Sequence, residues 1–352
     1  MHRSTTGYHM PQLDALRGIA ALIVVISHSA NAGLIHSSLG SGFGQMGVGL
    51  FYALSAFLLT HLYANNPPNI RSIKDYLVRR AARILPLFYA VFVASLFIEL
   101  STGVSLFGAF DTLAVGVRNV FLIHGTGVLW SIPVEIQFYL VFVIFWVLII
   151  VDFRVALVFL ILFQSSVLLI SSVANFHQHS LAFYMHFFTF GCIAAIIFQN
   201  THLTRIISRS RILKAILTVL ILLTPVLLPA VRRDLFDLEW VPIFMDPVAI
   251  IWVAGIFVAF VFSIFPTNWV DNKYFRVLGE LSFGVYLIHM GVLRAVQTFP
   301  FEGAVSKAIG FVIVVLVTYM LAAIVNRFFE RPAQKWILKS IKKPTARRAK
   351  TA

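Results

Sequence analysis

The chain has 352 residues, of which 59% are hydrophobic and only 12% charged, and its mean hydropathy is +0.89. This composition excludes an ordinary soluble protein and predicts a polytopic membrane protein. A net charge of +14 could indicate a nucleic-acid partner in a soluble protein. Here the basic residues fall between apolar segments, as expected for cytoplasmic loops, so no nucleic-acid partner is expected. The single cysteine, Cys192, excludes an internal disulfide and disfavours a cysteine-based metal site.

Apolar segments recur along the whole chain, and each is long enough to cross a bilayer. Lipid cannot satisfy backbone polar groups and the segments are too uniformly apolar for barrel strands, so an all-α bundle of about ten transmembrane helices is expected. The predicted spans are 13–35, 43–64, 84–101, 128–151, 155–173, 181–199, 213–230, 246–265, 277–298 and 308–329.

Lysine and arginine are concentrated on one side of these spans, which predicts that both termini face the cytoplasm. Residues 1–338 then form a single transmembrane domain, and 339–352 a basic cytoplasmic tail that rests on anionic lipid headgroups. The first apolar segment is expected to be a retained span and not a cleaved signal peptide, because the region before it is long and contains Asp14.

The first segment with candidate functional side chains runs from Leu13 to His28, with Arg17 near its start. The helical rise places Arg17 and His28 about 16 Å apart, roughly half the hydrocarbon thickness. An ionisable group at that depth is expensive and usually functional. The alternative is a histidine that hydrogen-bonds to a neighbouring helix for packing alone.

A second segment, 76–86, carries Arg79, Arg80 and Arg83 between the second and third spans. Arg80 and Arg83 are three residues apart, so they are neighbours on one helix face, with Arg79 alongside. Clustered guanidinium groups suit phosphate recognition, although an ordinary positively charged loop gives the same pattern.

Two further segments place acidic and histidine side chains in apolar helices. Glu135 could orient a histidine, bind a sugar hydroxyl, act as an acid or base, or only form a structural ion pair. In segment 278–289, Glu280 lies near the cytoplasmic edge and His289 lies deep in the span. A functional role and a purely structural role are equally open for His289. The small residues of 47–58 predict close helix packing, and no histidine spacing typical of a metal site is present.

Taken together and in this order, these segments resemble the acyltransferase-3 family of integral membrane acyltransferases. The resemblance covers Leu13 to Pro332 and rests on LDALRGIAALIVVISH, GVGLFYALSAFLL, VRRAARILPLFY, LWSIPVEIQFYL, LGELSFGVYLIH and the closing FERP. The second motif departs from the family pattern, because Ser55 is followed here by Ala56 where glycine is usual.

The resemblance implies transfer of an acetyl group from acetyl-CoA to a hydroxyl of a carbohydrate or glycolipid, such as O-antigen or exopolysaccharide. His28 then matches the catalytic histidine and Arg17 its partner, with Glu135 the glutamate of the fourth-span motif. Arg80 and Arg83 match the arginine pair for the donor, which Arg79 adjoins. The candidate supporting residues are Ser55, Tyr139, Glu280 and His289.

The expected setting is a bacterial inner membrane, with acetyl-CoA as co-substrate, no metal, and a stand-alone form without the SGNH esterase-like domain of some relatives. His28 could act as a base for direct transfer or carry the acetyl group itself. Alternatives are a macrolide-type small-molecule acceptor, another acyl donor, or a transporter of a surface-glycan intermediate. The sequence leaves the oligomeric state open.

Overall fold

The computed structural model describes residues 10–106, 112–174, 178–239 and 241–342, and these residues form helices and no strands. This confirms the prediction of an all-α polytopic bundle. The α-helices are α1 (Pro11–Asn31), α2 (Phe43–Tyr63), α3 (Ile70–Thr102), α4 (Leu113–Val120), α5 (Ser131–Val151), α6 (Phe153–Ala174), α7 (Leu181–Gln199), α8 (Thr201–Arg209), α9 (Arg211–Leu222), α10 (Thr224–Leu227), α11 (Pro229–Phe236), α12 (Pro247–Val261), α13 (Lys273–Gln297), α14 (Gly303–Val325) and α15 (Arg331–Lys342). Short 3-10 turns precede α2 and α5, and a π-helical turn, Asn326–Glu330, joins α14 to α15.

Eight helical segments in the described part of the chain are long and apolar enough to cross a membrane. The residues of the other two predicted spans form shorter helices. Span 213–230 is divided after Leu222, because Pro225 lacks an amide hydrogen and its ring conflicts with a continued helix. Span 246–265 becomes the 15-residue α12, which is about 22 Å long.

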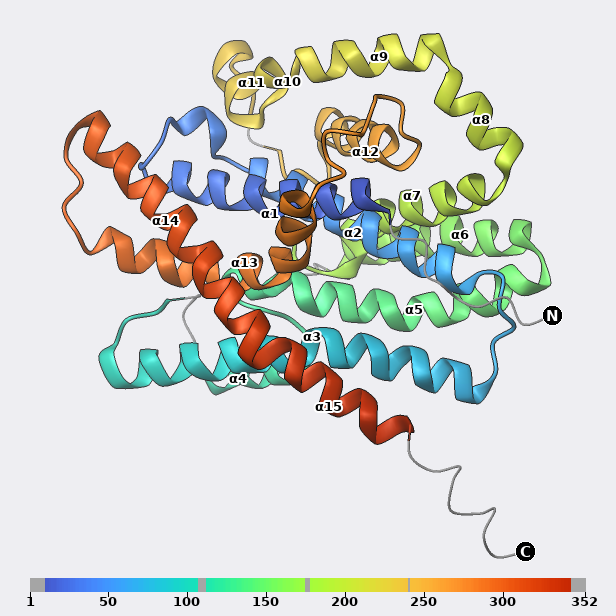
Figure 1. Ribbon diagram of the computed structural model, residues 1–352, viewed down its shortest axis with the longest axis horizontal. Helices are drawn as coiled ribbons and strands as arrows, with labels where there is room; N and C mark the ends of the chain where they lie inside the picture. The colour runs from blue at the N-terminus through green and yellow to red at the C-terminus, as the bar shows by residue number, and fades with distance from the viewer. Residues whose placement is uncertain (1–9, 107–111, 175–177, 240, 343–352) are drawn as a thin grey trace, which may run out of the picture.

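The bundle is built around α1 and α2, which lie along the long axis of the molecule with α3 and α5 (Figure 1). Helix α1 packs between α2 and α13, and α2 also packs on α7 and α12. The segment α14–α15 crosses the bundle obliquely and its last helix packs against α3. These contacts bring the predicted motifs of α1, α2, α3, α5 and α13 together.

Glycines allow α1 to approach its neighbours closely, as predicted for the second-span motif. A Cβ atom on Gly47 would lie 2.6 Å from the carbonyl oxygen of Ala20, and one on Gly279 would lie 2.4 Å from that of Asp14. Such distances exclude any side chain without a backbone shift. Small residues therefore hold α1 against α2 and α13, as is typical of membrane helix packing.

The end of the chain differs in detail from the predicted basic tail. Residues 339–342 belong to α15, which continues from the membrane-crossing helix without a break. The remaining part of the predicted tail, 343–352, lies outside the described residues.

Candidate functional site

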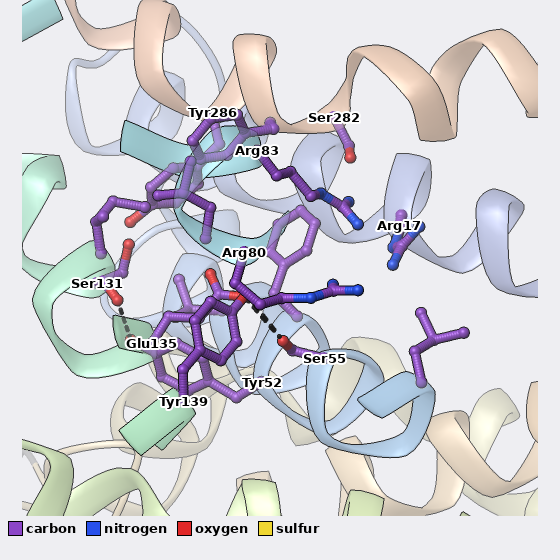
Figure 2. A pocket seen from close by; sticks show the side chains of 16 residues that line it. Arg17, Tyr52, Ser55, Arg80, Arg83, Ser131, Glu135, Tyr139, Ser282 and Tyr286 are labelled. Atoms are coloured by element: carbon purple, nitrogen blue, oxygen red, sulfur yellow. Dashed lines mark hydrogen bonds between the residues drawn. The ribbon is translucent and has the colours of Figure 1, made fainter. Parts of the chain in front are cut away.

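A cavity inside the bundle is lined by three arginines and a single carboxylate (Figure 2). It contains about 680 Å³ of space free of atoms, its mouth included. The helices α1, α2, α3, α5 and α13 all contribute to it. The lining residues are Arg17, Val48, Phe51, Tyr52, Ser55, Leu58, Arg80, Arg83, Ile84, Ser131, Ile132, Glu135, Tyr139, Ser282, Phe283 and Tyr286.

Positive charge exceeds negative charge in this cavity. Arg17 has a long ion pair with Asp14 in its own helix, at 3.7 Å, and its side chain is only 17% exposed. Arg83 makes no salt bridge with any described carboxylate, and the buried Nε atom of Arg80 has no hydrogen-bond partner among the described residues. Under-neutralised guanidinium groups in an apolar bundle favour an anionic ligand, since buried charges are normally paired.

The helical spacing on α3 explains which arginines reach the cavity. Arg80 and Arg83 are three residues apart and project from one face of α3 toward Arg17 (Figure 2). Arg79 is exposed and is not among the lining residues. The structure therefore brings together Arg17, Arg80 and Arg83 but leaves Arg79 outside this group.

Glu135 is held by two hydroxyl groups that donate to the same carboxylate oxygen. Ser55 Oγ lies 2.8 Å from Glu135 Oε1, and the hydroxyl of Tyr139, one helical turn later on α5, lies 2.5 Å from it. The second oxygen, Oε2, accepts no hydrogen bond from the described residues. Glu135 and His28 have separate hydrogen-bond partners, Ser55 and Tyr139 for the carboxylate and His289 for the imidazole.

His28 contacts another histidine instead. Its Nδ1 atom lies 2.8 Å from Nε2 of His289 on α13, and His289 is fully buried. The Nδ1 atom of His289 lies 2.7 Å from the backbone carbonyl oxygen of Tyr286. The Nε2 atom of His28 has no hydrogen-bond partner among the described residues.

The histidine pair and the cavity lie on the same side of α1 but are separated along it. Arg17 lines the cavity, whereas His28 and His289 do not. The ring of Tyr286 lies between them: it lines the cavity, its centroid is 6.0 Å from that of His289, and its hydroxyl donates to the carbonyl of Val128 at 2.9 Å. Phe51 packs against Tyr286 with a centroid distance of 6.1 Å. These two aromatic rings form the boundary between the cavity and the histidine pair.

Glu280 occupies a different position from the other candidates. It is exposed, lies outside the cavity lining, and forms an ion pair with Arg331 at 2.7 Å that connects α13 to α15. Ser55 and Tyr139, by contrast, both line the cavity. Of the four candidate supporting residues, Ser55 and Tyr139 contact Glu135, His289 contacts His28, and Glu280 joins two helices.

Several polar lining residues, among them Ser131, Ser282 and Tyr286, were not predicted from the sequence. A signal for two of them was present, because Ser282, Tyr286 and His289 follow one another at spacings of four and three on α13 and so share a helix face. Among the described residues, no group of three or more histidine, cysteine or acidic side chains could hold a metal ion.

Comparison with known proteins adds evidence for the family. The family model for an acyltransferase domain, Acyl_transf_3, matches residues 10–327. The chain is 23% identical to the O-acetyltransferase OatA of Staphylococcus aureus strains NCTC 8325 / PS 47 and COL, over 93% of its own length and 57% of theirs. It therefore spans little more than half of these relatives. No solved structure matches it.

Proposed function

The chain belongs to the acyltransferase-3 family, and from this premise we propose that it is a membrane O-acetyltransferase that uses acetyl-CoA. The acceptor is a hydroxyl group of a cell-surface polysaccharide or glycolipid, and the setting is a bacterial inner membrane with the arginine-rich loops on the cytoplasmic side. The observation that carries the proposal is the arginine-lined cavity on the face of α1 that also bears His28.

Arg17, Arg80 and Arg83 supply the positive charge that the phosphates of CoA require. Guanidinium groups form charge-assisted, often bidentate hydrogen bonds to phosphate oxygens. The unpaired Nε of Arg80 is a donor suited to such a ligand. Arg79, exposed beside the site, contributes to the local potential and not to the cavity lining.

The pantetheine arm of CoA is a long extended chain that can carry its thioester away from its phosphates. His28 is eleven residues beyond Arg17, about 16 Å along α1, so a donor anchored at the arginines would extend toward it. This route leads past Phe51 and Tyr286, whose rings bound the cavity on that side. Movement of these rings is therefore part of the proposed path.

At His28, the unpartnered Nε2 atom is the reactive nitrogen, because Nδ1 is occupied by His289. In direct transfer, Nε2 takes the proton of the acceptor hydroxyl while the hydroxyl oxygen attacks the thioester carbon. The carbon–sulfur bond breaks, and the proton passes to the departing thiolate, giving the acetyl ester and free CoA thiol. In the alternative route, Nε2 attacks the thioester carbon first, the carbon–sulfur bond breaks, CoA leaves as its thiolate, and the ring carries the acetyl group. The acceptor oxygen then attacks this acetyl carbon, the carbon–nitrogen bond breaks, and the hydroxyl proton passes to the thiolate.

Glu135 has a supporting role in this scheme. Its carboxylate lies in the arginine-lined cavity with Ser55 and Tyr139 as donors, so it partly balances the guanidinium charge and fixes one edge of the cavity. It also has a free oxygen with which to accept a hydrogen bond from a ligand hydroxyl or amide.

The acceptor and the acyl chain are proposed from the family relatives. The names of the relatives describe O-acetyltransferases, which supports an acetyl donor and a hydroxyl acceptor. A small-molecule acceptor or a longer acyl donor would use the same residues, and a transporter of a glycan intermediate would need no thioester.

The test is release of CoA thiol by the purified protein in lipid, with acetyl-CoA and crude surface glycan, compared with His28→Ala. We expect release by the wild type, loss in His28→Ala, and unchanged acetyl-CoA binding, because the donor cavity is separate from His28. Full activity of folded His28→Ala would contradict the role of His28. Transport of a glycan across vesicles without any thioester, together with no acetyl-CoA binding, would favour the transporter.

A further inference from the structure

The hydrogen bonds around His289 determine where its proton lies. A backbone carbonyl oxygen can only accept, so the 2.7 Å contact with the carbonyl of Tyr286 requires a hydrogen on Nδ1 of His289. The carbonyl of Val285, at 3.2 Å, faces the same nitrogen. A neutral imidazole with its hydrogen on Nδ1 has a lone pair on Nε2, and that lone pair faces His28.

The proton of His28 is placed by its contact with His289. Its Nδ1 atom lies 2.8 Å from Nε2 of His289, which is shorter than a contact between stacked rings and requires a hydrogen between the two nitrogens. Since Nε2 of His289 is the acceptor, Nδ1 of His28 is the donor. The neutral His28 ring must therefore keep its lone pair on Nε2, the nitrogen without a partner among the described residues.

We propose that His289 is a positioning residue that fixes the tautomer of His28, so that Nε2 of His28 presents its lone pair to the substrates. This deepens the proposed function and rests on it, because a base or nucleophile at His28 needs that lone pair. His289 acts through His28 and does not touch the reacting atoms.

The position of His289 suits this role. The residue is fully buried on α13, its ring is nearly parallel to that of His28 (13° between planes), and its Nδ1 atom is held by the backbone of its own helix. A freely rotating imidazole could flip by 180° and exchange the positions of its two nitrogens. The His289 ring would lose the buried hydrogen bond of its Nδ1 atom in such a flip. When Nε2 of His28 accepts a proton, the lone pair of His289 also stabilises the imidazolium through the Nδ1 hydrogen.

The direct test is ¹⁵N NMR of protein labelled at histidine ring nitrogens and reconstituted in lipid. The His28 signal is assigned by its disappearance in His28→Ala. We expect a hydrogen on Nδ1 and a lone pair on Nε2 in the neutral wild-type ring. The opposite tautomer of His28 in the wild type would overturn the proposal, and this result does not depend on any measurement of activity.

Two variants of His289 test the consequence for turnover. In His289→Leu the acceptor for Nδ1 of His28 is lost, so we expect kcat to fall by at least about 100-fold with an unchanged KM for acetyl-CoA. In His289→Gln the amide oxygen can accept the same hydrogen, and we expect part of the activity to return. Equal activity in His289→Leu and wild type would contradict the proposal.

A matched control is His186→Leu, which removes a half-buried histidine of α7 that is not among the cavity-lining residues and whose ring packs on Phe187 and Phe190. We expect the tautomer of His28 to be unchanged in it. If His28→Ala retained activity while the wild-type tautomer were as expected, the proposed function would fail and the assigned hydrogen-bond arrangement would stand.

Discussion

Arg17 and His28 project from nearly the same face of α1, because eleven residues correspond to about three helical turns, yet only Arg17 lines the cavity. The arginine-lined cavity and His28 are therefore rigidly connected through one helix. A ligand that engages both must be long and anionic at one end, and the acetyl-CoA of the proposed function meets both requirements.

Removing a cavity arginine should weaken donor binding more than it slows chemistry. Arg83→Ala and Arg80→Ala each delete a guanidinium that lines the cavity. A hydrogen bond to a charged group contributes about 1.5–3 kcal/mol, so KM for acetyl-CoA should rise roughly 10- to 150-fold. Steady-state kinetics with varied acetyl-CoA measures this.

The matched control for the arginine variants is Lys74→Ala, which removes an exposed cation from the same helix, outside the cavity. It should leave KM close to the wild-type value. Arg79→Ala should give an intermediate, salt-sensitive effect, because an exposed charge acts through screened electrostatics. An equal rise in KM for all four variants would contradict this and indicate that α3 attracts the donor through net charge alone. The four are Arg80→Ala, Arg83→Ala, Arg79→Ala and Lys74→Ala.

The two hydroxyl donors to Glu135 should be energetically coupled. Ser55→Ala and Tyr139→Phe each remove one hydrogen bond to the same carboxylate oxygen, and each leaves the other in place. We expect the double variant to lose more thermal stability than the sum of the single losses, because Oε1 then has no protein donor. Thermal unfolding in detergent of the wild type, the two single variants and the double variant measures the coupling. Strictly additive losses would contradict the prediction.

Close packing between α1 and α2 should be intolerant of a single methyl group. In Gly47→Ala the new Cβ would meet the carbonyl oxygen of Ala20 at 2.6 Å, so we expect a loss of about 1–3 kcal/mol in stability. Gly116→Ala is the control: apart from the neighbouring residues and backbone of its own helix, no described atom lies within 4 Å of the added Cβ, and the change should be neutral or slightly stabilising. Thermal unfolding separates the two.

The partly buried ion pair between Arg232 and Asp246 should be important for the packing of α12. Asp246 is 5% exposed, pairs with Arg232, and caps α12 by accepting from the amides of Val248 and Ala249. Asp246→Ala leaves the guanidinium of Arg232, which is 15% exposed, without its carboxylate, so we expect a loss of at most about 3–5 kcal/mol. The exposed pair of Arg233 and Asp234 provides the control, since Asp234→Ala should cost at most about 1 kcal/mol. Equal melting temperatures of the two variants would contradict this prediction.

The sequence by itself determined the class of the protein and the local spacing of its candidate site residues. Hydropathy alone identifies membrane-crossing helices, because lipid imposes a minimum apolar length on every span. Spacing alone places Arg80 and Arg83 on one face, because helical periodicity is local. The close packing predicted from the glycines of α2 is likewise a local property, and the structure confirms it.

The tertiary structure alone decided which of these residues meet. His28 and His289 are 261 positions apart, and Ser55 and Glu135 are 80 apart, so neither contact has a local signal. Hydropathy could not assign these partners, because lipid is as apolar as the bundle interior and a lipid-facing helix surface resembles a buried one. Spacing puts Arg80 and Arg83 on one face of α3, but only the packing of the helices determines that this face borders the cavity and that Arg79 lies outside it. The same packing places Tyr286 at the cavity and His28 against a second histidine.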